Sequence, residues 1–210
     1  MNLFHFYSNH AGEAFGLLGQ HLVLVGVSTV VAVLIGLPLG IVLTRRPAWR
    51  GPVLGIANVF QTIPSLALFG ILIPLPFIGG IGARTAIVAL VVYALLPIIR
   101  NTYTGIMGVD PAVREAGRGM GMTDGELLRQ VEMPLAAGVI LAGVRVATVI
   151  GVGVATIAAA VGAGGLGVYI FRGVATVDDT LILAGALPAA ALALVADGLF
   201  GLLERRVAWR

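Results

Sequence analysis

The 210-residue chain contains no cysteine and no lysine, and its three histidines all lie within the first 21 residues. The absence of cysteine excludes disulfides, thiolate metal sites and cysteine nucleophiles. The absence of lysine excludes Schiff-base and Ser/Lys chemistry. An enzymatic site beyond residue 21 would therefore have to be built from carboxylates, arginines and hydroxyls.

Charge is also scarce. Only 11% of the residues are charged, 59% are hydrophobic, and the mean hydropathy is +1.03. A soluble domain carries about a quarter charged residues, so this composition indicates a protein of the lipid bilayer. The pI near 10 comes from dispersed arginines and does not indicate nucleic-acid binding. No basic segment precedes an apolar run at the N-terminus, so we expect no cleavable signal peptide.

Five apolar segments are long enough to cross a bilayer, which takes about 20 residues. They are 20–44, 52–73, 81–99, 135–160 and 180–203. We predict an all-α integral membrane protein with an extracytoplasmic lead-in over 1–19, a transmembrane domain over 20–205 and a cytoplasmic tail over 206–210. Gly36 and Gly40 form a small-xxx-small pair, which predicts close helix packing in the first span.

The arginines predict the orientation. With five spans, three clusters lie on one side of the membrane: 45, 46 and 50; 114, 118 and 129; and 205, 206 and 210. Only Arg84 and Arg172 lie in connections on the other side. Basic residues concentrate in cytoplasmic loops, so we expect the N-terminus outside and the C-terminus in the cytoplasm.

The densest polar segment is 110–134, DPAVREAGRGMGMTDGELLRQVEMP. Asp110 is a good N-cap and Pro111 a good first helical residue. Thr123 and Glu126 have the spacing of a capping box. The segment therefore predicts two short helices that meet at an elbow rich in glycine, between spans three and four. Such an element can present a knob to a soluble partner, or it can be a solvated loop without one.

This segment resembles the coupling motif of the membrane subunits of binding-protein-dependent ABC importers, the MetI-like permeases. The motif reads Glu-Ala-Ala, three residues, Gly, nine residues, then Ile-x-Leu-Pro. At the corresponding positions this chain has Glu115, Ala116, Gly117, Gly121, Val131, Met133 and Pro134. Three of these depart from the motif by small changes of size: Gly117, Val131 and Met133. The resemblance implies that the segment inserts into a groove on an ATPase subunit and transmits its closure to the spans.

Four stretches resemble the osmoprotectant branch of these importers, which takes up glycine betaine, carnitine and choline: 58–68, 93–105, 109–122 and 162–173. The resemblance implies a non-catalytic permease without a cofactor in a bacterial or archaeal inner membrane. ATP would be bound by a separate ATPase subunit. A separate extracytoplasmic solute-binding protein and a second permease, giving a homodimer or a heterodimer, would complete the importer. Amino-acid or other osmolyte cargo remains an alternative.

The second span has polar residues and a proline in its middle. These are Gln61, Thr62, Pro64 and Ser65, and Tyr93 in the third span is an aromatic candidate for the same region. Irregular backbone at this depth is tolerated only against protein or a water-filled cavity. The segment is therefore a candidate pathway or gate. The alternative, to which we give equal weight, is a kink that packs on a neighbouring helix.

Two arginines belong to the spans or their edges. Arg145 lies 11 positions into the fourth segment, where a charge calls for a partner or for contact with water; we favour a structural role, with snorkelling to the inner surface as the alternative. Arg100 and Asn101 are expected at the inner edge of span three, where we favour Arg100 as an interface anchor over a substrate contact.

Three other interpretations are weaker. Gly162, Gly164 and Gly167 match G-x-G-x-x-G, but a dinucleotide site needs a preceding strand and a distant acid; we expect a turn and a short helix instead. A membrane-embedded enzyme would need catalytic groups within the spans. A channel or secondary transporter would need charged relays or a repeat, and neither is evident.

Overall fold

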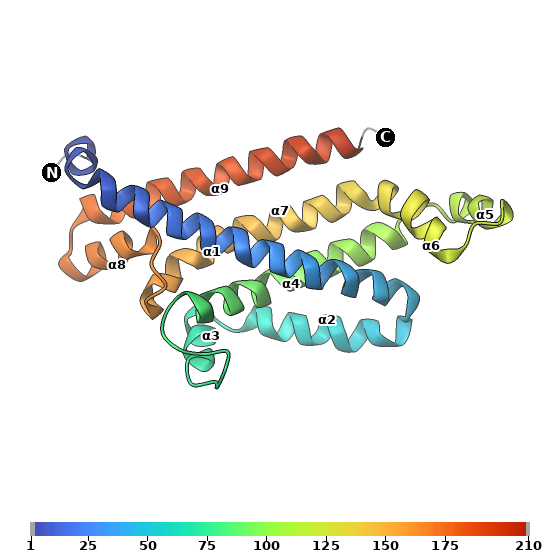
Figure 1. The fold of residues 1–210 in the computed structure, drawn as a ribbon, viewed down its shortest axis with the longest axis horizontal. Helices are drawn as coiled ribbons and strands as arrows, with labels where there is room; N and C mark the ends of the chain where they lie inside the picture. Colours follow the sequence, from blue (N-terminus) through green and yellow to red (C-terminus); the bar gives the residue numbers. More distant parts are fainter. Residues whose placement is uncertain (1–2, 209–210) are drawn as a thin grey trace.

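The computed structural model describes residues 3–208, and every regular element in that range is helical (Figure 1). Four helices are long and apolar enough to cross a membrane. They are α1 (Leu3–Arg45), α4 (Ala83–Met107), α7 (Met133–Ile157) and α9 (Asp179–Ala208). The fifth candidate is a bent pair, α2 (Pro47–Thr62) and α3 (Ser65–Leu72), whose axes differ by 102°. The prediction of about five spans is confirmed.

The helices α1 and α4 extend furthest beyond the apolar segments predicted. The helix α1 begins at Leu3, and the backbone leaves helical geometry at His10 (φ −121°, ψ 23°), so helix also covers most of the lead-in. The helix α4 continues to Met107, eight residues beyond its expected end at position 99. Hydropathy measures the part of a helix that suits hydrocarbon, whereas a helix continues as long as it satisfies its own backbone groups.

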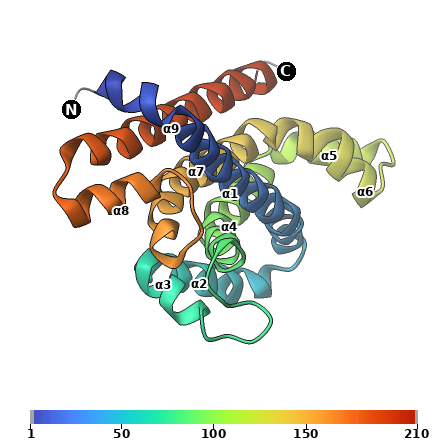
Figure 2. The same cartoon turned by 60° about the vertical axis from the view of Figure 1, so that its left-hand side comes forward.

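The long helices form an elongated bundle (Figure 1). The helix α4 packs against both α1 and α7, and α9 packs along α7. The pair α2–α3 lies on the opposite side of the bundle from α9 (Figure 2). The elements α5 (Pro111–Gly119) and α6 (Asp124–Leu127) project from one end, while α8 (Gly167–Thr176) covers the other end beside the start of α1.

Small residues set the spacing at the centre. A Cβ added to Gly40 would lie 2.5 Å from Cβ of Thr102, and one added to Gly36 would lie 2.9 Å from Cγ2 of Ile98. The predicted small-xxx-small pair therefore forms the contact between α1 and α4. Close approach of helices through small residues is the usual packing mode in membranes, where the hydrophobic effect does not drive helices together.

The glycine-rich segment after α7 is a loop that packs on α1. A 3₁₀ turn, η2 (Ala158–Val161), precedes Gly162, Gly164 and Gly165, whose φ angles are between +75° and +79°. The backbone N–H of Gly165 donates to Oε1 of Gln20 over 3.0 Å. Helix α8 follows and continues to Thr176. The turn and short helix are as predicted, and no strand precedes them within residues 3–208.

Candidate functional site

The segment 110–134 forms the predicted elbow. The side chain of Asp110 accepts from the N–H of Ala112 over 2.8 Å and caps α5. Gly121 turns the chain with φ of +84°, a conformation that favours glycine. The N–H of Thr123 donates to the Glu126 carboxylate over 2.8 Å, and Thr123 Oγ1 accepts from the Glu126 N–H, which completes the capping box. Local capping chemistry is therefore sufficient to explain both helix starts.

The second helix of the elbow does not stop at Pro134. A π-helical turn, η1 (Leu128–Glu132), joins α6 directly to α7, and the N–H of Met133 bonds to the carbonyl of Leu128. Proline has no N–H to donate, and a wider turn is one way for a helix to accommodate it. The second helix of the elbow and the fourth span are consequently one continuous helix, through which a displacement of α6 can reach the membrane.

The coupling-motif residues divide into an exposed and an inner set. Glu115, Ala116 and Gly121 are exposed at the tip of the elbow. Gly117 is buried, and a Cβ there would lie 2.8 Å from Cδ1 of Leu127. In the continuous helix, Val131 and Met133 are half-buried and Pro134 is exposed. The tip can therefore contact a partner while the inner set holds the two arms of the elbow together.

Glu132 is a residue of this region whose role the sequence did not indicate. Its side chain is fully buried, and its carboxylate accepts two hydrogen bonds from Arg45 at the end of α1. Nε of Arg114 in α5 lies 3.3 Å from the same carboxylate. Nη2 of Arg114 also donates to the carbonyl of Ile106 in α4. We call Glu132, Arg45 and Arg114 the charged joint, because they connect the elbow to α1, α4 and α7.

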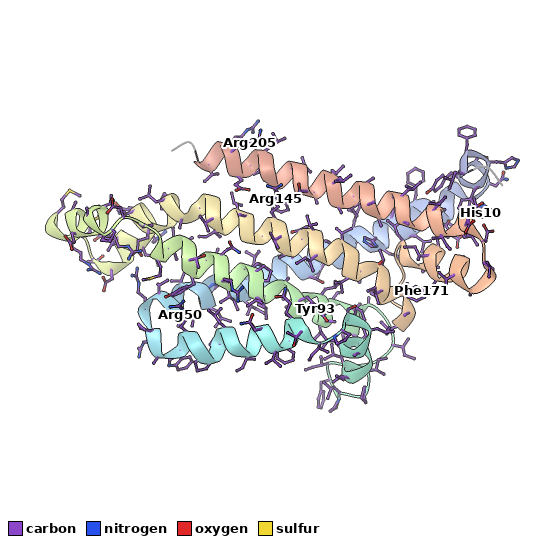
Figure 3. The ribbon with its side chains drawn as sticks, turned by 180° about the vertical axis from the view of Figure 1, so that it is seen from behind. His10, Arg50, Tyr93, Arg145, Phe171 and Arg205 are labelled. Atoms are coloured by element: carbon purple, nitrogen blue, oxygen red, sulfur yellow. The ribbon has the colours of Figure 1, made fainter. Side chains whose placement is uncertain are left out.

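The helix break in the second span lies at Ile63 and Pro64, within the segment predicted to break. The hydroxyl of Tyr93 donates to the carbonyl of Ile63, and only 6% of Tyr93 is exposed. Tyr93 thus supports the break from α4; Figure 3 shows its position in the bundle. Thr62 is exposed at the break.

The remaining polar residues predicted there occupy the same turn. Gln61 is half-buried, Pro64 is exposed and precedes α3, and Ser65 is the first residue of α3. The structure therefore brings the candidate gate residues together at one bend.

Arg145 pairs with carboxylates of α9. Its Nε and Nη2 lie 2.6 and 2.7 Å from the two carboxylate oxygens of Asp197, and its Nη1 lies 3.3 Å from Glu204. Figure 3 shows Arg145 between the two helices. The bidentate geometry suits guanidinium and carboxylate. Of the two interpretations of Arg145, the structure bears out pairing with a carboxylate.

Comparisons with known proteins agree with this architecture. A family model described as "Binding-protein-dependent transport system inner membrane component" matches residues 32–209. The osmoprotectant import permease protein OsmW of Salmonella typhimurium is 46% identical over 206 residues, covering 97% of this chain and 96% of the relative. The choline transport system permease protein OpuBB of Bacillus subtilis is 44% identical over 202 residues, covering 96% and 92%.

Solved structures have the same fold. The inward-facing MetNI methionine ABC transporter matches with a TM-score of 0.80 at 27% identity, covering 90% of this chain and 93% of that chain. An amino acid ABC transporter crystallised with histidines matches with a TM-score of 0.80 at 21% identity, covering 98% and 99%. The chain therefore belongs to the family of binding-protein-dependent transport system inner membrane components and is a multi-pass permease subunit of an ABC importer.

Proposed function

We propose that this permease carries small compatible solutes with a quaternary ammonium group, such as glycine betaine, choline and carnitine. The similarity to osmoprotectant and choline permeases over nearly the full chain supports this cargo. An amino acid is the second candidate, favoured by the similarity to the methionine transporter, although that likeness is more distant at 27% identity.

The elbow is the proposed docking element for an ATPase subunit. Its exposed residues Glu115, Ala116 and Gly121 would contact the ATPase, while Gly117 and the helix start at Val131, Met133 and Pro134 would carry the movement inward. The observation that supports this most strongly is the charged joint around the buried Glu132, since a rigid connection is what a transmitted push requires. The chain itself would be non-catalytic and free of cofactors, with ATP bound by the ATPase.

Orientation and assembly follow from the same proposal. The elbow faces the cytoplasm, the lead-in over 1–19 lies outside, and the tail over 206–210 lies inside. A separate solute-binding protein delivers cargo at the outer face. A second copy of this chain, or a similar permease, completes the pathway, because a single five-span subunit is too small to enclose one.

Uptake of labelled glycine betaine, choline and carnitine tests the proposed function. A host without its own osmolyte importers would express the chain with its ATPase and receptor. ATP-dependent uptake at high osmolarity is expected, with loss of uptake in the double variant Glu115→Ala/Gly121→Asp and normal membrane insertion. Wild-type uptake by the double variant would refute the docking assignment. No uptake of any of the three by an assembled importer would refute the quaternary-amine cargo.

Single cysteines test the orientation, since the natural chain has none. Cysteines at Ala48 and Met122 should react with a membrane-impermeant maleimide only from the cytoplasmic side. A cysteine at exposed Val177, between α8 and α9, should react only from the outside. Labelling of either cytoplasmic position from outside would overturn the proposed topology.

A further inference from the structure

Arg100 differs from Arg145 in its charge partners. Arg145 is neutralised by two carboxylates, and Arg45, Arg114 and Arg172 also form ion pairs. Among residues 3–208, no carboxylate lies within ion-pair distance of Arg100. Its hydrogen-bond partner is the neutral side-chain oxygen of Asn58, 3.1 Å from Nη2. A positive charge without a counter-ion therefore remains on this part of the bundle.

The position of Arg100 argues against a simple anchor at the inner surface. It lies seven residues before the end of α4 at Met107, about 10 Å along the helix axis. Helical side chains tilt toward the N-terminus of their helix, which for α4 is away from the elbow. Its partner Asn58 lies 11 residues into α2, about 16 Å from the start of that helix at Pro47. The guanidinium thus points back into the membrane.

Further polar residues lie beside Asn58 in α2. Asn58, Gln61 and Thr62 fall within roughly 100° of the helix circumference, on a face that also includes Leu54. In α4, Tyr93 and Arg100 are seven residues apart and share one face. We call Asn58, Gln61, Thr62 and Arg100 the polar column. It begins at the helix break supported by Tyr93.

An exposed arginine and an exposed amide at this depth are not compatible with contact to lipid tails. Charged residues in transmembrane segments face a bundle interior or a water-filled cavity, and both Arg100 and Asn58 are exposed on the single chain. The polar column should therefore border the aqueous pathway. A guanidinium with free N–H groups in that place is suited to bind a carboxylate through two parallel hydrogen bonds.

We propose that Arg100, held in place by Asn58, binds the carboxylate of a zwitterionic solute during its passage and so favours carboxylated quaternary amines over choline. The inference rests on the proposed function and identifies the part of the cargo that is recognised. Choline has the same trimethylammonium group as glycine betaine but a hydroxyl in place of the carboxylate. It gains no ion pair from Arg100 and is repelled by its charge.

The test compares uptake of glycine betaine with uptake of choline in the full importer, each at a saturating concentration for the separate receptor. Arg100→Gln should lower glycine betaine uptake relative to choline uptake by about ten- to a hundredfold, the usual range for a lost hydrogen-bonded charge contact. Arg100→Lys should restore part of the ratio, since it keeps the charge but not the bidentate geometry. Arg84→Gln, at the outer end of the same helix, is the matched control and should leave the ratio unchanged.

The outcomes separate this inference from the proposed function. An unchanged ratio in Arg100→Gln, with wild-type uptake of glycine betaine, would overturn the role of Arg100 alone. A wild-type importer that carries choline but not glycine betaine would overturn it as well. Uptake of neither solute would overturn the cargo proposal and this inference with it. Receptor-stimulated ATP hydrolysis, measured in every variant, shows that the importer has assembled.

Discussion

Two clusters of arginine and carboxylate connect the helices of this permease, and they differ in burial. Glu132 of the charged joint is fully buried and receives two arginines, Arg45 from α1 and Arg114 from α5, whose side chains are 33% and 17% exposed, so the two clusters differ mainly in the burial of the carboxylate. Arg145 and Asp197 are about one-third to two-fifths exposed and connect only α7 and α9. Breaking a buried pair leaves an uncompensated charge, whereas partly exposed pairs are screened by solvent. Substitutions in the charged joint should therefore destabilise the protein more than substitutions in the Arg145–Asp197 contact between α7 and α9.

The largest effect is expected from Glu132→Gln. The change keeps the side-chain volume but leaves Arg45 and Arg114 without a counter-charge. Loss of one partner in a buried pair costs about 3 to 5 kcal/mol, and the 33% and 17% exposure of the two arginine side chains places this loss at the lower end of that range. We expect a clearly lower melting temperature in detergent and loss of uptake. Glu115→Gln, on the exposed tip, is the control and should melt like wild type. An unchanged melting temperature in Glu132→Gln would mean that the joint does not hold the helices.

A smaller effect is expected from Asp197→Asn. Arg145 keeps its contact with Glu204, 3.3 Å away, and the cluster is partly exposed. The melting temperature should fall by less than in Glu132→Gln, and uptake should be retained. A larger fall than in Glu132→Gln, measured in the same detergent, would reverse the proposed ranking of the two clusters.

Inside the elbow, two glycines of α5 allow a finer comparison. Gly117→Ala places a methyl group against Leu127 and should cost about 1 to 2 kcal/mol of stability through overpacking. Gly119→Ala meets open space and should be neutral or slightly stabilising, because alanine favours helix. Thermal unfolding of both variants checks this. Equal melting temperatures would show that the arms of the elbow are not tightly packed.

The smallest effect is expected at the capping box. Thr123→Ala removes the side chain that accepts from the N–H of Glu126 and should cost about 0.5 to 1 kcal/mol. Hydrogen exchange should increase at the first turn of α6 but not in α7, since the cap acts on local N–H groups only. Thr176→Ala, near the C-terminal end of α8, caps no helix start and should leave exchange in α6 unchanged. Faster exchange throughout α7 would show that the cap stabilises the whole continuous helix.

Some elements of this protein could be predicted because their signals are local. The Asp110 cap, the Thr123 capping box and the turn at Gly121 each depend on a few neighbouring residues. The break at Pro64 likewise follows from one proline among polar neighbours. The start of α1 and the end of α4 could not be predicted from hydropathy, because the apolar segment is shorter than the helix that contains it.

The sequence by itself determined the class of protein, the span count and the elbow, since apolar length, arginine placement and capping residues act within one segment. Only the tertiary structure decided which charges meet. Arg45 and Glu132 are 87 positions apart, and no local sequence pattern predicts that they form an ion pair. The structure also decides that Arg145 has carboxylate partners and that, among residues 3–208, Arg100 has none. Those partners lie on neighbouring helices, so they are known only once the helices are packed.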